Sequence, residues 1–236
     1  MIIDKGLSIA ETDNLLQMSA AYIDFLKLTF GTAALYDPGI LREKITLAAG
    51  YGVAVYPGGT FFEIALWRKN LTPYFRQLRE LGFQWVEISD GTIEIPMEQR
   101  KQSIHLASQE GLQVITEVGK KDPLSQPEIT EMVDAALWDL EEGAKWVIIE
   151  ARESGHGIGI YDQQGGIIAT KLNDLRAAIP LEHIIWEAPL KGQQARLINE
   201  FGPNVNLGNI PPGEALALEA LRLGYRSDTW NVDSVH

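Results

Sequence analysis

Cysteine is absent from the 236 residues, which excludes a disulfide, a thiolate metal site and a thiol nucleophile. The four histidines show no HxxE or HExxH spacing, so a histidine-bound metal is not predicted. No apolar run approaches the roughly 18 residues of a membrane-spanning helix. The first residues, Met-Ile-Ile-Asp-Lys-Gly, lack the basic and apolar regions of a secretory signal. We therefore expect a cytoplasmic protein.

Basic residues are outnumbered, because 20 Lys and Arg stand against 32 Asp and Glu, for a net charge of −12. This balance disfavours nucleic acid or an anionic membrane surface as the main partner. It still allows a small anionic substrate, since a few Lys and Arg can dominate the charge inside a cleft. The motifs GxGxxG, GxxxxGK[ST] and GxSxG are also missing, which disfavours dinucleotide-binding proteins, P-loop proteins and serine hydrolases.

Eight short apolar runs are spaced by about 29 residues on average, the length of a strand, a helix and their two loops. The runs are Met1–Asp4, Phe25–Phe30, Val53–Pro57, Trp85–Ser89, Gln113–Val118, Trp146–Ala151, Ile184–Ala188 and Asn204–Leu207. Segments with helical periodicity lie between them, and most end at a glycine that suits a left-handed cap. These are Ile40–Ala49, Leu71–Leu81, Met97–Glu110, Ile129–Glu142, Gln193–Phe201 and Glu214–Leu223.

Strands that are apolar on both faces and alternate with helices predict a parallel sheet covered by helices. Eight such units in 236 residues predict an α/β fold of one domain over residues 1–236, a (β/α)8 TIM barrel whose first strand starts at the N-terminus. An open doubly wound sheet is the alternative. Five tryptophans are expected to pack the strands against the helices: Trp67, Trp85, Trp138, Trp146 and Trp186.

One glutamate stands near the C-terminal end of each of four consecutive strands. These residues are Glu87, Glu117, Glu150 and Glu187. The C-terminal strand ends of a barrel converge on one mouth, and a carboxylate buried there needs a cation or a donor. One interpretation is a structural network in which Lys27 and Arg152 neutralise the acids. The other is a Mg²⁺ site formed by Glu117, Glu150 and Glu187, in which at least two carboxylates reach one ion.

Cationic residues and a glycine pair accompany the acids. Lys27 lies mid-strand between two leucines, where an exposed lysine would be out of place. Lys120 and Lys121 follow a glycine directly after the fifth strand, either in a solvated loop or with at least one ammonium over the barrel mouth. Gly58 and Gly59 can present backbone N–H groups to an anion, although such a pair is also common in turns.

Six sequence segments are distinctive in this order: YPGGT at 56–60, EISDG at 87–91, TEVGKK at 116–121, RESG at 152–155, EAP at 187–189 and NL at 206–207. Together they resemble the phosphosulfolactate synthase family, which includes members outside methanogens and plant heat-stress-associated proteins. The similarity extends from residue 4 to residue 229. It implies a (β/α)8 barrel and a lyase that uses Mg²⁺ to add sulfite to phosphoenolpyruvate, giving (2R)-phospho-3-sulfolactate. In methanogens this is the first step toward coenzyme M.

Taken with the residues above, the resemblance implies a set of roles. Catalysis falls to Lys121, Lys120 and Arg152, substrate binding to Lys27, Gly58, Gly59, Asn206 and Arg226, and Mg²⁺ binding to Glu117, Glu150 and Glu187. Sulfite needs no activating base, so the protein must stabilise the charge that builds up on the substrate carboxylate. A lysine then protonates C2, and the resemblance favours Lys121. A nearby Mg²⁺ is expected to lower the pKa of that lysine.

Two alternatives stay open at this stage. Methanogen members carry two lysines after the RESG segment, where this chain reads Gly-His-Gly-Ile-Gly at 155–159, so a different nucleophile could attack phosphoenolpyruvate. The barrel could also be a non-catalytic, stress-associated protein. Neither the oligomeric state, including a homo-oligomer, nor the native metal follows from the sequence.

Overall fold

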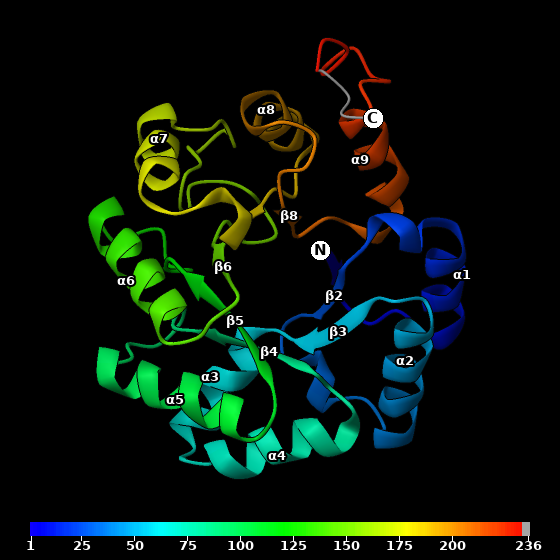
Figure 1. The fold of residues 1–236 in the computed structure, drawn as a ribbon, viewed down its shortest axis with the longest axis vertical. Helices are drawn as coiled ribbons and strands as arrows, with labels where there is room; N and C mark the ends of the chain where they lie inside the picture. The colour runs from blue at the N-terminus through cyan, green and yellow to red at the C-terminus, as the bar shows by residue number, and fades with distance from the viewer. Residues whose placement is uncertain (233–236) are drawn as a thin grey trace.

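The computed structural model describes residues 1–232, and its helices surround the strands in chain order, so that α9 comes to lie beside the first elements (Figure 1). The strands are β1 (Ile2–Asp4), β2 (Phe25–Leu28), β3 (Ala54–Pro57), β4 (Trp85–Ser89), β5 (Gln113–Val118), β6 (Trp146–Ile149), β7 (Ile184–Glu187) and β8 (Leu207–Gly208). The α-helices are α1 (Ile9–Ser19), α2 (Pro38–Gly50), α3 (Gly59–Trp67), α4 (Leu71–Leu81), α5 (Met97–Gln109), α6 (Ile129–Glu141), α7 (Ala169–Ala178), α8 (Lys191–Phe201) and α9 (Ala215–Arg222). Short 3-10 helices are η1 (Ala20–Tyr22), η2 (Thr32–Ala34), η3 (Leu181–His183) and η4 (Pro212–Glu214).

All strand pairs are parallel, and they form two sheets, β1-β2-β3 and β4-β5-β6-β7-β8. Ile2 and Ile210 make a single parallel bridge between the first strand and the segment after β8. Within residues 1–232, β3 packs against β4 without a ladder. Closure into one eight-stranded barrel is therefore not detected. The strands nevertheless follow chain order, without the reversal of a doubly wound sheet.

Most element positions predicted from the sequence agree with the structure, and the disagreements have local causes. The last strand is β8 at Leu207–Gly208 rather than 204–207, because Asn206 uses its side chain to cap the carbonyl of Ile184 at 3.0 Å. Helices α1, α3 and α7 were not predicted. The signal for α1 was present, since Ser8 and Glu11 form a capping box at its start.

The side chains that face the interior form two layers, one after the other along the strands. The lower layer is apolar and consists of Met1, Phe25, Tyr56, Trp85, Ile115, Ile148 and Ile185. Two residues further along β2, β4, β5, β6 and β7, on the same face of each strand, come Lys27, Glu87, Glu117, Glu150 and Glu187. The apolar layer thus forms a floor beneath a layer of buried charges at the C-terminal strand ends.

The tryptophans divide between interior, core and surface. Trp186 packs as expected, stacked on Phe201 of α8 with 5.6 Å between ring centroids. Trp85 and Trp146 belong instead to the interior floor, where both rings lie against Phe25. The prediction for Trp67 was wrong, because 74% of this residue is exposed at the end of α3. No helix within residues 1–232 combines the length and apolar character needed to cross a bilayer.

A buried ion pair fixes the loop after β1. The Asp4 carboxylate accepts the N–H groups of Gly6 and Leu7, each at 2.8 Å, through one oxygen. Its other oxygen lies 2.5 Å from the ammonium of Lys44 on α2, and both side chains are fully buried. The Lys44 ammonium also donates to the Leu7 carbonyl at 2.6 Å. These contacts hold residues 5–7 in one conformation.

Replacing Lys44 with Met should lower the free energy of unfolding by about 3–5 kcal/mol, because Asp4 would keep a buried charge without its partner. Equilibrium unfolding in urea measures this loss. The double variant Lys44→Met/Asp4→Asn removes the stranded charge and should recover part of the stability. An unfolding free energy for Lys44→Met within experimental error of the parent would contradict the assigned importance of the pair.

Candidate active site

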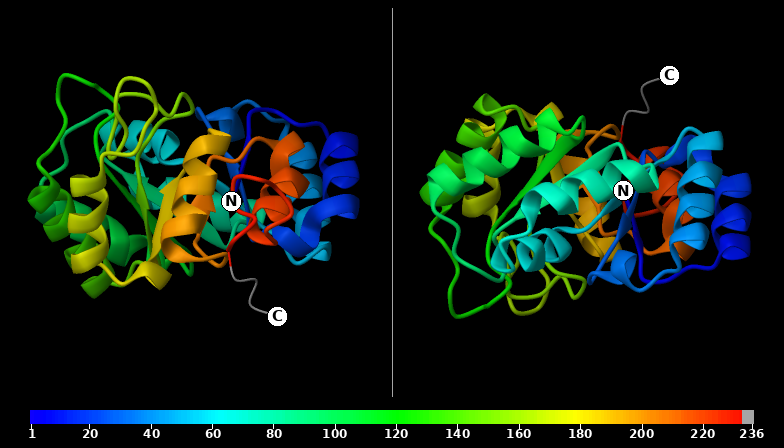
Figure 2. Two further views of the ribbon diagram at one scale, coloured as in Figure 1. Left: turned by 90° about the horizontal axis from the view of Figure 1, so that it is seen from above. Right: turned by 90° about the horizontal axis from the view of Figure 1, so that it is seen from below.

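A cavity of about 170 Å³, which we call the carboxylate cavity, opens at the C-terminal ends of the strands and contains the buried charges. The loops after β5 and β6 project on one and the same side of the molecule (Figure 2). Among the residues predicted for the site, those lining the cavity are Lys27, Gly58, Gly59, Glu117, Lys121, Glu150, Arg152 and Glu187. Glu87, Thr60 and Asn209 also line it.

Lys27 is the centre of the charged layer. Its ammonium lies 2.9 Å from Glu87, 3.0 Å from Glu117 and 3.2 Å from Glu187, and its side chain is 8% exposed. Burial lowers the pKa of Lys27, but the carboxylates of Glu117, Glu87 and Glu187 outweigh burial and hold that pKa well above its usual value. This shift favours the charged form of Lys27, which neutralises part of the acidic cluster, as the structural interpretation of the sequence predicted for this residue. The Arg152 guanidinium, the other cation of that interpretation, makes no ion pair with these glutamates within residues 1–232.

Glu87 is held by the first turn of α3. The Gly59 N–H donates to its carboxylate at 2.6 Å, at the end of the helix where the dipole favours a negative charge. A Cβ at Gly59 would collide with the Ser89 side chain, so only glycine allows this approach. The Gly59 N–H that was expected to meet a substrate anion thus binds a carboxylate of the protein itself. Burial raises the pKa of Glu87 to about 7, against the opposing effect of Lys27.

Glu117 and Glu150 face the ammonium of Lys121. The Lys121 nitrogen lies 3.5 Å from Glu117 and 3.8 Å from Glu150. Burial, with the charges of Glu117 and Glu187, raises the pKa of Glu150 well above its usual value. Burial opposes ionisation of Glu117 as well, but Lys27 and Lys121 bring its pKa below the usual value. For Lys121, the effect of burial is exceeded by that of Glu117 and Glu150, which raise its pKa. The protein's own groups therefore act opposite to the lowering expected from a nearby cation.

The three glutamates expected to bind Mg²⁺ converge. One oxygen from each of Glu117, Glu150 and Glu187 lies within 4.8 Å of the others, close to the separation of about 4.2 Å between opposite ligands of Mg²⁺. Glu117 Oε1 and Glu150 Oε2 are buried and accept no hydrogen bond from residues 1–232. Four buried glutamates face two lysines, which leaves an excess of two negative charges that the raised pKa values of Glu87 and Glu150 reflect. A hard divalent cation fits this donor set and this charge.

The two adjacent lysines point to different places. Lys121 reaches into the cavity, where its ammonium donates to Thr60 Oγ1 at 3.3 Å. Lys120 turns away and binds the Asp90 carboxylate at 3.0 Å and the Asp90 carbonyl at 2.7 Å. Asp90 in turn pairs with Arg100, whose guanidinium donates to the Glu117 carbonyl at 3.0 Å. Lys120 thus supports the loop that presents Lys121.

Arg152 lies at the rim of the cavity, exposed and beyond the end of β6. Its backbone adopts a φ of +58°, so the alternation of the strand no longer sets its direction. Its N–H donates to Glu150 at 2.5 Å, and its guanidinium donates to the Lys121 carbonyl at 3.3 Å. The remaining guanidinium donors can meet an anion that enters the mouth.

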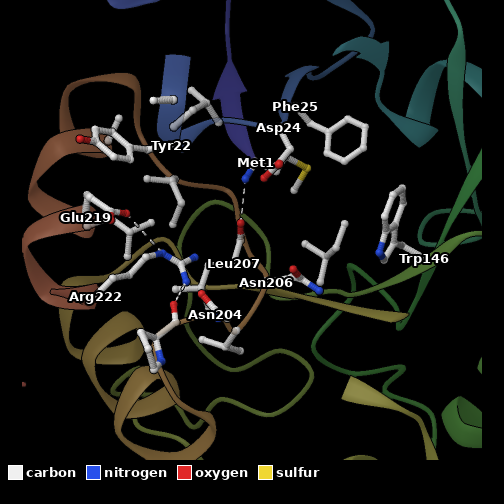
Figure 3. A pocket seen from close by; sticks show the side chains of 18 of the residues that line it. Met1, Tyr22, Asp24, Phe25, Trp146, Asn204, Asn206, Leu207, Glu219 and Arg222 are labelled. Carbon is white, nitrogen blue, oxygen red and sulfur yellow. Dashed lines mark hydrogen bonds and ion pairs between the residues drawn. The ribbon is translucent and has the colours of Figure 1, made fainter. Parts of the chain in front are cut away.

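Two residues predicted to bind substrate lie elsewhere. Asn206 precedes β8 and lines a different cavity of about 620 Å³ at the opposite ends of the strands, with Met1, Trp146 and Arg222 (Figure 3). Arg226 lies after α9 and is not among the described residues that line the carboxylate cavity. The error for Asn206 follows from the misplaced last strand, because the residue that reaches the mouth after β8 is Asn209.

The sequence interpretation left out several residues near the site. Asn209 has a φ of +55°, is 4% exposed, and its Oδ1 has no partner within residues 1–232. Glu63 of α3 is buried behind the cavity and accepts Ser89 Oγ at 2.6 Å and the Thr92 N–H at 3.0 Å. A correct end for β8 would have identified Asn209, whereas nothing in the local sequence distinguishes Glu63.

Comparison with solved structures places the chain among TIM-barrel-like folds. It superposes on 3-hexulose-6-phosphate synthase from Salmonella typhimurium with a TM-score of 0.59, covering 95% of this chain and 98% of that one. The sequence identity is 15%, so this likeness concerns the fold alone.

Sequence comparison gives much closer relatives. The chain is 45% identical to phosphosulfolactate synthase of Methanothermobacter thermautotrophicus over 233 residues, covering 97% of this chain and 90% of that one. It is 41% identical to the enzyme of the same name from Methanocaldococcus jannaschii, with 98% and 92% covered. Its identity to that of Bacillus subtilis is 37%, with 98% and 91% covered. The sequence model of (2R)-phospho-3-sulfolactate synthase (ComA) matches residues 1–228. The chain is an enzyme that belongs to the (2R)-phospho-3-sulfolactate synthase family.

Proposed function

We propose that this enzyme adds sulfite to phosphoenolpyruvate to give (2R)-phospho-3-sulfolactate and that it requires Mg²⁺. The proposal is supported by one observation in a chain of this family: three converging carboxylates and the Lys121 ammonium lie in the same cavity. The cavity thus combines ligands for a hard cation with a proton donor. Those are the two functions that the addition needs from the protein.

The addition forms a C3–S bond and a C2–H bond and consumes the π bond between C2 and C3. The sulfur lone pair of sulfite attacks C3, and the π electrons of the C2–C3 double bond move onto the substrate carboxylate. The resulting enediolate carries extra negative charge, which returns to C2 when that carbon takes a proton. No bond to phosphate breaks, so the phosphoryl group stays in the product. The protein must therefore stabilise an oxyanion and deliver one proton to one face.

Lys121 is suited to deliver the proton. Its raised pKa keeps it protonated at neutral pH, and its ammonium is held at one side of the cavity by Glu117, Glu150 and Thr60. Delivery from one side gives C2 a single configuration. The lysine recovers its proton from solvent or from bisulfite, so the reaction is balanced.

Glu117, Glu150 and Glu187 would hold Mg²⁺. When bound, the ion supplies Lewis-acid stabilisation to the substrate carboxylate. Lys27 offsets the repulsion between Glu117 and Glu187, and Arg152 at the rim binds an anionic group of the substrates.

An assay with phosphoenolpyruvate, sulfite and Mg²⁺ tests the function directly. We expect consumption of both substrates in equal amounts, with the product identified by phosphorus NMR and mass spectrometry. Binding of phosphoenolpyruvate without consumption of sulfite would instead indicate a different nucleophile. Failure to bind either compound would indicate a barrel without this activity.

Replacing Lys121 with Met should slow turnover by roughly 10²–10⁴-fold, the usual contribution of general acid catalysis, while phosphoenolpyruvate still binds. Lys120→Met removes the same charge from the adjacent position and should slow turnover far less, since Lys120 acts only by supporting the loop. Steady-state kcat and calorimetric binding of phosphoenolpyruvate make the comparison. If Lys121→Met keeps nearly full turnover, Lys121 is not the proton donor.

Replacing Glu150 with Gln should raise the Mg²⁺ concentration needed for half-maximal activity by at least roughly tenfold, since even groups outside the metal's ligand shell contribute that much. Gln keeps the size of the side chain and removes the negative charge. Calorimetric titration with Mg²⁺ alone should show the same loss of affinity. Glu94→Gln, at a carboxylate that is 84% exposed, is the matched control. Equal Mg²⁺ affinity in Glu150→Gln and the parent would exclude Glu150 as a ligand.

A further inference from the structure

A second cavity of about 420 Å³ adjoins the carboxylate cavity at the same end of the strands. The two share Ile3, Glu153 and Asn209 in their walls. The second cavity lies between the loops that follow β1, β7 and β8. Lys5 and Gly6 come from the loop after β1, Pro189 from the loop after β7, and Pro211 and Pro212 from the segment after β8. It has no role in the chemistry described so far.

Lys5 stands at the junction of the two cavities. Its ammonium lies 2.6 Å from the Glu153 carboxylate in the loop after β6 and 5.8 Å from the centroid of the Phe30 ring. Both members of the ion pair are about half exposed, at 55% and 47% of their side chains. The loop that carries Lys5 is fixed by Asp4 and Lys44 through the buried contacts described above. A rigid loop thus presents a cation whose partner is an exposed, displaceable anion.

Asn209 lies at the same junction with an unused hydrogen-bonding group. It is almost fully buried, and no residue within 1–232 donates to its Oδ1. Its left-handed backbone, with φ at +55°, is a strained conformation that cavities and ligand sites retain. The side-chain amide of Asn209 also carries two N–H groups, and Asn209 lines both cavities. These groups can donate to an anion that lies between Asn209 and Lys5.

The charge of the carboxylate cavity, the inner of the two, bears on where a phosphate can lie. Four buried glutamates line that cavity against Lys27, Lys121 and Arg152, and the excess of negative charge disfavours a phosphate dianion there. Glu11 and Glu153 line the second cavity beside Lys5, so an anion gains the ammonium of Lys5 there by displacing Glu153. In TIM barrels the loops after strands 7 and 8 frequently form the phosphate site. Pro189 and Asn209 belong to those two loops and line the second cavity.

We propose that the second cavity is the subsite for the substrate phosphate, with Lys5 and Asn209 as its ligands and Glu153 as the internal anion that the phosphate displaces. This inference rests on the proposed function, because phosphoenolpyruvate is the phosphate carrier there. Its carboxylate and double bond then lie in the inner cavity, near Lys121. Glu153 acts as a competitor that occupies Lys5 when substrate is absent.

Three variants test the subsite with opposite expectations. Lys5→Met should raise KM for phosphoenolpyruvate roughly 10–100-fold, the usual worth of a hydrogen bond to a charged group, and leave KM for sulfite unchanged. Lys5→Arg keeps the charge and should retain most of the affinity. Glu153→Gln removes the competitor and should lower KM for phosphoenolpyruvate by about 2–5-fold, the size of an exposed ion pair. Lys101→Met, which breaks an exposed pair on the outer helices, is the matched control.

Calorimetric titration of inorganic phosphate without sulfite separates this inference from the proposed function. The parent should bind phosphate, and Lys5→Met should bind it more weakly by the same factor as its change in KM. If the parent does not turn over phosphoenolpyruvate with sulfite, the proposed function fails, yet the phosphate titration still decides the subsite. A rise in KM for sulfite alone, or equal phosphate affinity in the parent and Lys5→Met, would overturn the subsite.

Discussion

The burial of four carboxylates beside two lysines is the constraint on which the rest of the site depends. Lys27 contacts Glu87, Glu117 and Glu187, and an ammonium group can neutralise only one of them. The remainder must be balanced by Lys121, by the first turn of α3, by protons or by a metal ion. Each of these partners must come within about 3–4 Å of a carboxylate oxygen. The acids therefore determine where the loop of Lys121 and the start of α3 can lie.

The two lysines of the cavity have different roles because their surroundings differ. Lys27 comes from a strand and is almost fully buried among carboxylates. Lys121 comes from a loop, is 29% exposed at its side chain and faces the open part of the cavity. The first therefore balances charge within the buried layer, and the second can reach a molecule in the cavity, in agreement with its proposed role as proton donor. Asp90 and Arg100 keep this division by holding Lys120 away from the cavity.

The sequence predicted what depends on position along a strand. Glu87, Glu117, Glu150 and Glu187 each stand near the C-terminal end of a strand, and these ends were expected to converge on one mouth, where the four side chains do lie. Prediction failed where the chain leaves the strand. β8 begins three residues later than predicted, so Asn206 lies before the strand, and the asparagine at the mouth is Asn209. The glycines after β3 were interpreted as an anion-binding pair, with a turn as the alternative, although they start a helix. Contacts between distant loops, such as Lys5 with Glu153, have no signature in the local sequence.

The apolar floor under the charged layer has a kinetic consequence. Phe25, Trp85, Ile115, Ile148 and Ile185 separate the charges from the cavity at the opposite strand ends. Within residues 1–232, this floor closes the charged layer toward the opposite strand ends, so the proposed substrates would enter, and their single product would leave, at the C-terminal strand ends. An anion bound near the mouth would obstruct one that must lie deeper. The deeper substrate would therefore have to bind first.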